Sequence, residues 1–69
     1  MTRSEAEKLM ESLLQCQKEL DKAVVTAHDI EDEKERLELK KAITSAIGII
    51  FTDAILVIAQ QYPDLNPYK

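Results

Sequence analysis

The side chains best suited to nucleophilic chemistry are a single cysteine, Cys16, and a single histidine, His28. A thiol needs a base within hydrogen-bond reach to act as an enzyme nucleophile. If both residues lie on one helix, a rise of about 1.5 Å per residue places them about 18 Å apart. They cannot form a nucleophile–base pair within one chain. Cys16 is therefore expected to be a small, buried residue in a helix interface.

Metal and cofactor sites are not expected either. One cysteine and one histidine are too few for a typical zinc site. The acidic run from Asp29 to Glu35 lacks the glycine and the alternating oxygen ligands of a calcium loop. Such charge runs usually form solvated turns and helix starts. Because the sequence also lacks a glycine-rich phosphate loop and a Ser/His/Asp set, it predicts a protein that is not an enzyme and has no cofactor.

Length and composition predict one small helical domain spanning residues 1–69. The chain is 45% hydrophobic and 32% charged, with one Gly and two Pro, which favours helices over a sheet. A core this small usually needs a disulfide, a metal or oligomerisation for stability. Only oligomerisation remains. The net charge of -4 disfavours nucleic-acid binding, and with no visible export signal a cytoplasmic location is expected.

The positions of the apolar residues predict the elements. Thr2 and Ser4 each precede a glutamate by three residues, which is the spacing of a capping box at a helix start. We expect a first helix over about 4–28, a second over about 32–61 with Asp29 or Asp32 as N-cap, and an extended tail over 62–69. The first helix carries a heptad seam, in which apolar and small residues recur every three or four positions. Its members are Ala6, Leu9, Leu13, Cys16, Leu20, Ala23, Ala27 and Ile30.

The apolar stripe moves to a new face in the second helix, which indicates that the chain reverses direction. Its members are Leu39, Ile43, Ala46, Ile50 and Val57. This pattern predicts an antiparallel two-helix hairpin, in which Ala6 lies near Ile55. Two hairpins docked as a homodimer would form a four-helix bundle and cover the apolar end of the second helix.

A membrane span is the alternative interpretation of residues 42–59, which contain one charge, Asp53. About twenty such residues can cross a bilayer. However, Ser45, Thr52, Asp53 and Gln60 gather on one sector of the helix, and a central Asp costs about 2.5 to 3.5 kcal/mol on insertion scales. The core helix of a bundle is therefore the preferred interpretation, and membrane binding is disfavoured.

A second stripe, on the back of the second helix, combines apolar and polar side chains and is a candidate surface for a protein partner. The proline-containing tail adds two tyrosines and a leucine suited to docking in a groove. An exposed helix edge and a disordered terminus are the alternative interpretations. The candidate partner-binding residues are Ile49, Asp53, Leu56, Gln60, Tyr62, Leu65 and Tyr68.

The hairpin layout, with its seam of small and large residues, resembles the two-helix hairpin dimers typified by the plasmid copy-number regulator Rop. That resemblance implies a four-helix bundle that binds paired RNA loops. The chain also resembles, in size and type, small regulatory proteins of bacteria and phages, including anti-activators that block a transcription factor or enzyme. That second resemblance implies a protein-binding regulator, inhibitor or adaptor with a protein target. We expect this function first, an RNA-binding bundle second and a small single-pass membrane protein third.

Overall fold

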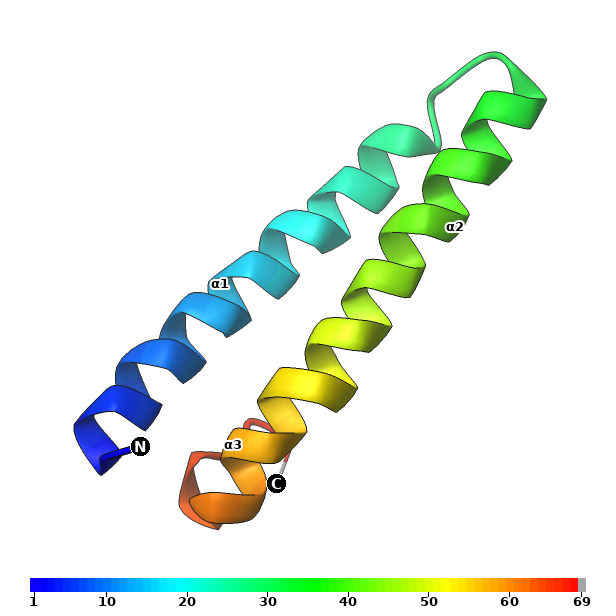
Figure 1. Ribbon diagram of the computed structural model, residues 1–69. Coiled ribbons are helices and arrows are strands. Elements are labelled where there is room, and N and C mark those ends of the chain that lie inside the picture. The colour runs from blue at the N-terminus through cyan, green and yellow to red at the C-terminus, as the bar shows by residue number, and fades with distance from the viewer. Residues whose placement is uncertain (69) are drawn as a thin grey trace.

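Two long antiparallel helices joined by one turn make up the chain, as Figure 1 shows for the computed structural model, which describes residues 1–68. Helix α1 (Arg3–Ala27) leads through the turn to α2 (Glu33–Ile50). The second helix continues through a π-helical turn, η1 (Phe51–Ile55), into α3 (Leu56–Gln61). A short 3-10 turn, η2 (Pro63–Leu65), follows. No strand occurs within residues 1–68, and the prediction of an all-α helical hairpin is confirmed.

Side-chain caps set where both helices begin. The Thr2 hydroxyl accepts from the Glu5 N–H at 3.2 Å, and the Thr2 N–H donates to the Glu5 carboxylate at 2.6 Å, which completes the expected capping box. Asp32 is the N-cap of α2, where its Oδ1 accepts from the Glu35 N–H at 2.8 Å. Arg36 then closes the turn by donating to the Ile30 carbonyl at 3.0 Å.

The buried core lies at the end of the hairpin away from the turn, where both chain termini also lie (Figure 1). Ile55 is its centre, with 0% of its surface exposed. The prediction that Ala6 lies near Ile55 is confirmed, because both belong to the same buried cluster. The buried members of this cluster are Ala6, Met10, Ile55, Ile58 and Ala59.

The face that α1 turns towards α2 differs from the predicted seam by one residue. Met10 and Gln17, predicted to flank the seam, are buried, whereas Leu9 is 46% exposed and Cys16 is exposed. The prediction that Cys16 is buried is therefore wrong for the single hairpin. The physical reason is that a helix with a broad apolar stripe can direct only part of it towards one partner helix. The remaining edge stays open.

The π-helical turn η1 changes the face of the second helix in the same way. Its extra residue per turn rotates everything that follows by roughly one residue, or about 100°. Ile58 and Ala59 consequently face α1, while Val57, predicted on the apolar stripe, is 44% exposed. Thr52 supports the turn, because its hydroxyl donates to the Gly48 carbonyl at 3.0 Å. Leu39, at the other end of the predicted stripe, is 47% exposed.

Candidate interaction surfaces

The residues considered for catalysis and metal binding are separated in the structure. His28 ends α1, where its ring nitrogens lie 3.0 and 3.3 Å from Nζ of Lys40, and Cys16 lies at the middle of the same helix. Within residues 1–68, no three His, Cys, Asp or Glu side chains gather closely enough to hold a metal ion. In the acidic run, Asp32 acts as a helix cap. None of these groups forms a reactive cluster.

The predicted outer stripe of the second helix is open to solvent over most of its length. Ile49 is 59% exposed, and Asp53 and Gln60 are exposed as well. The Asp53 carboxylate lies 3.0 Å from the neighbouring Thr52 hydroxyl, which shares its single proton between this carboxylate and the Gly48 carbonyl. Leu56 is half-buried, and the exposed Val57, about one turn beyond Asp53, lies closer to solvent. The outer stripe therefore combines one exposed aliphatic side chain, Ile49, with one carboxylate and one amide, and the exposed Val57 lies beside it.

The tail folds back onto the hairpin, whereas the sequence predicts an extended segment. Tyr62 and Leu65 are half-buried and pack against the core cluster. The Tyr62 hydroxyl donates to the Met1 carbonyl at 3.0 Å, and the exposed Tyr68 ring meets Phe51 edge to face at 5.2 Å between centroids. The described part of the tail thus fastens the base of the hairpin, and Lys69 lies outside the described residues.

Arg3 links the start of α1 to this tail. Its guanidinium forms an ion pair with Asp64, a second one with Glu7 at 3.1 Å, and lies 5.8 Å from the centroid of the Tyr62 ring. The hydrogen bond with Asp64, followed by the charge of that carboxylate, raises the pKa of Arg3 above its usual value. Arg3 therefore remains fully charged, and the contact holds both chain ends together.

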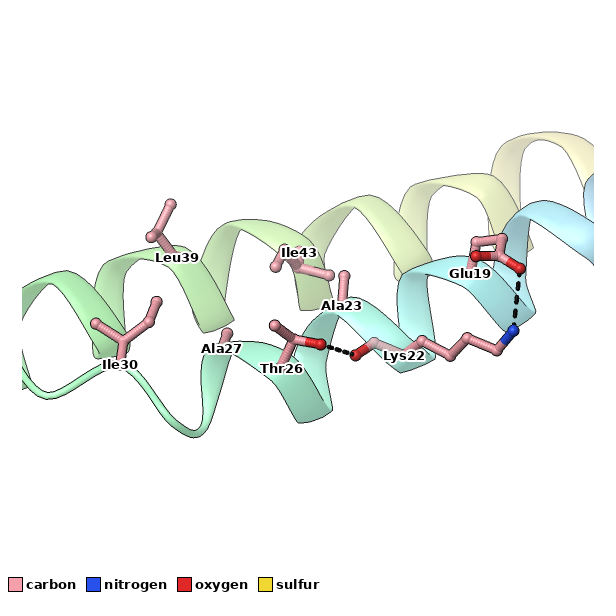
Figure 2. A pocket seen from close by; sticks show the side chains of 8 residues that line it. All are labelled: Glu19, Lys22, Ala23, Thr26, Ala27, Ile30, Leu39 and Ile43. Carbon is pink, nitrogen blue, oxygen red and sulfur yellow. Dashed lines mark hydrogen bonds and ion pairs between the residues drawn. The ribbon is translucent and has the colours of Figure 1, made fainter.

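A groove of about 490 Å³ lies between the helices near the turn (Figure 2). Its floor is apolar, and Ala23 and Ala27 make it hollow because their side chains are so short. On its rim, Lys22 forms an ion pair with Glu19 at 3.2 Å, and Thr26 donates to the Lys22 carbonyl at 3.1 Å. The full lining is Glu19, Lys22, Ala23, Thr26, Ala27, Ile30, Leu39 and Ile43.

Sequence reasoning did not find this groove, although its signal is present. Leu9, Cys16 and Ala23 repeat every seven residues, so they share one edge of α1, and Ile30 follows in the turn. Ala23 and Ile30 line the groove, and Leu9 and Cys16 continue the same edge towards the base. The groove therefore lies in line with the open edge of α1.

A buried polar side chain lies behind this edge. Gln17 is 8% exposed, and its Nε2 donates to the Ile47 carbonyl at 3.2 Å. Its Oε1 is buried without a hydrogen-bond partner among residues 1–68. An amide at such a position costs stability but can fix how two helices align. It places the middle of α1 beside Ile47 of α2.

By length and composition alone, the second helix could cross a membrane. Residues Glu33–Gln61 form one helical run of 29 residues, and only 17% of its most apolar stretch of 18 residues is buried. Core helices of soluble proteins can be equally long and apolar, but they are mostly buried. Here many of its apolar residues are half-buried against the rest of the hairpin, and Ile49 and Val57 are exposed.

Comparison of this chain with protein-family models, with curated proteins and with solved structures finds no match.

Proposed function

We propose that this protein is a small, non-enzymatic protein-binding regulator or adaptor that acts in the cytoplasm as a homodimer of helical hairpins. The observation that carries the proposal is the set of large apolar side chains that the second helix leaves exposed, namely Leu37, Leu39, Ile49 and Val57. Contiguous exposed apolar surface on a small protein usually marks an interaction site. Two hairpins packed face to face would form a four-helix bundle and cover much of it.

The outer stripe is the surface that such a dimer leaves for a protein target. Ile49 projects from the back of α2, opposite the side that faces α1, and Asp53 and Gln60 supply polar contacts beside it. An aliphatic anchor with polar groups around it matches the composition of protein interfaces. Tyr62 and Leu65, which the sequence also suggests for this role, hold the tail against the core. Tyr68 is exposed and completes the surface.

The experiment compares capture of protein partners by the wild-type chain and two variants. Ile49→Asp places a charge on the outer stripe, and Val25→Asp places the same charge at an exposed position on α1. Loss of a buried interface anchor typically costs about 2 kcal/mol or more, which is about thirtyfold in affinity. We expect Ile49→Asp to lose a partner that wild type and Val25→Asp retain, while all three remain dimeric. Equal capture by all three would contradict the assignment of the stripe.

A single-pass membrane protein is the second candidate, because residues Glu33–Gln61 are long and apolar enough to span a bilayer. In the hairpin, however, α1 runs beside this stretch and carries Glu7, Lys8 and Glu11. Moving such charges into the bilayer centre costs about 2.5 to 3.5 kcal/mol each. The hairpin would have to open before the second helix could insert. Membrane fractionation with alkaline carbonate separates the candidates, because the homodimer should stay in the supernatant and a spanning helix in the pellet.

A further inference from the structure

The edge of α1 through Leu9 and Cys16 is open in the single hairpin, and the exposed area of the hairpin indicates the size of the contact that could cover it. A folded monomer of 7.8 kDa typically exposes about 4,400 Å². This hairpin exposes 5046 Å². The excess of roughly 650 Å² is close to the roughly 800 Å² that each partner buries in a standard protein interface. A contact of standard size with one further hairpin would remove an area of this magnitude.

We propose that this cover is a second copy of the chain, docked in antiparallel orientation with the two Cys16 side chains facing each other across the two-fold axis. The inference rests on the proposed homodimer and adds its face and topology. Cys16 lies at the middle of α1, and it is exposed on the edge that leads into the groove. An isologous contact centred there is the arrangement in which the two copies overlap over their full length.

The residue sizes along α1 support this centre. Leu9 and Ala23 lie seven residues before and after Cys16, so an antiparallel copy places Leu9 against Ala23 of the partner. Leu9 is large and exposed, and Ala23 forms part of the hollow floor of the groove. Each leucine would therefore fill the groove of the other hairpin. Alternation of large and small residues across facing positions is how helix layers interdigitate.

The second helix also has residues that would pair with those of the partner about the same two-fold axis. Gln17 lies beside Ile47, so the axis through Cys16 passes α2 near Ile47. About this point, Ile43 would face Ile50 of the partner, and Leu39 would face Ala54 of the partner. Ile43 and Leu39 line the groove, and Ile50 lies two helical turns after Ile43 on the same edge. Both helices thus have self-complementary faces about a common centre.

The tail occupies the opposite side of the hairpin only at its base. On the other side of the hairpin base, Tyr68 of the tail covers Phe51. Phe51 lies about 100° around the helix from Ile50. The outer stripe with Ile49 is left free for a protein target.

Cysteine cross-linking tests the proposal, because Cys16 is the only cysteine of the chain. Mild oxidation or a short bis-maleimide should convert the wild-type protein into a covalent dimer, and Cys16→Ser should remove this product. In the Cys16→Ser background, Leu9→Cys mixed with Ala23→Cys should cross-link. Either variant alone should not, because identical sites would lie about 21 Å apart along the axis. Val25→Cys is the matched control on the same helix and should also give no product.

A second set of variants tests the face without cysteines. Ala23→Glu should raise the dimer dissociation constant by at least about 100-fold, because it buries an unpaired charge in the contact. Val25→Glu should leave it unchanged, and far-UV circular dichroism verifies that both variants stay helical. A stable dimer that neither cross-links at Cys16 nor responds to Ala23→Glu would overturn this face while leaving the proposed homodimer intact. A protein that is monomeric in solution at all concentrations would overturn the homodimer as well. The same holds for a protein that is found only as a monomer bound to lipid vesicles.

Discussion

Ile55 is the side chain whose truncation should weaken the hairpin most, because it is the largest that is fully buried. Ile55→Ala removes three carbon groups at about 0.8 kcal/mol each, and the cavity left among Ala6, Met10 and Ile58 adds to this loss. The expected destabilisation is therefore about 2.5 to 4 kcal/mol. A domain of this size has a total stability of roughly 3 to 10 kcal/mol. A large part of the folding free energy thus depends on one residue in the π-helical turn.

Urea denaturation followed by far-UV circular dichroism measures this effect, with all proteins at one fixed concentration because dimerisation adds to the apparent stability. Leu37→Ala is the matched control, since Leu37 is exposed on the same helical run, and it should change stability by less than about 0.5 kcal/mol. Leu13→Ala, at a half-buried position, should fall between the two. If Ile55→Ala and Leu37→Ala denature at the same urea concentration, the placement of the core around Ile55 is wrong.

Three further changes test the caps and the buried amide. Asp32→Ala removes the N-cap of α2 and should cost about 0.5 to 2 kcal/mol in the same denaturation assay; no loss would contradict the cap. Gln17→Met removes the unpartnered Oε1 and should stabilise the hairpin by about 1 kcal/mol. A clear loss of stability would mean that the hydrogen bond from Gln17 to the Ile47 carbonyl stabilises more than the buried Oε1 costs. Hydrogen bonding from the Thr2 backbone N–H, then from its side chain, lowers the pKa of Glu5. The Glu5 carboxylate therefore stabilises the folded state above the usual carboxyl pKa of 4.5. This stabilisation is lost as the pH falls through the lower pKa that Glu5 has in the folded protein. Glu5→Gln should therefore show a shallower loss of stability in acid than wild type, and identical pH profiles would contradict the capping box.

The helices and their starts could be predicted from the sequence because their signals are local. Capping residues such as Thr2 and Asp32 act within three positions of the helix start, and a period near 3.6 residues identifies a helix without any knowledge of its neighbours. The change of apolar face after Ile30 also identified the hairpin, because a single straight helix would keep one face. These features need no information about tertiary contacts.

The orientation of each helix about its own axis could not be predicted in the same way. The first helix has two adjacent edges that could pack, one through Met10 and Gln17 and one through Leu9 and Cys16. Periodicity alone does not decide which of them meets the second helix. The π-helical turn at Phe51–Ile55 adds a rotation that no propensity signals. Val57 consequently moves outwards. Side-chain packing between the helices decides both features.

The tail and the groove depend on contacts between residues distant in the sequence. The ion pair between Arg3 and Asp64 and the edge-to-face contact of Tyr68 with Phe51 hold a segment whose two prolines indicate only that the helix ends. Likewise, Ala23 and Leu39 line one groove only after the chain has reversed. The candidate partner-binding stripe around Ile49 and Asp53 could be located from the sequence because it belongs to a single helix. Its role remains a prediction.

Sedimentation equilibrium of the wild-type protein over a range of micromolar concentrations tests the central claim most directly, since the homodimer underlies both the proposed function and the proposed face. In buffer without detergent, we predict a single species of about twice 7.8 kDa, which dissociates only on dilution. A mass of 7.8 kDa at every concentration, or material that stays in solution only with detergent, would contradict the account.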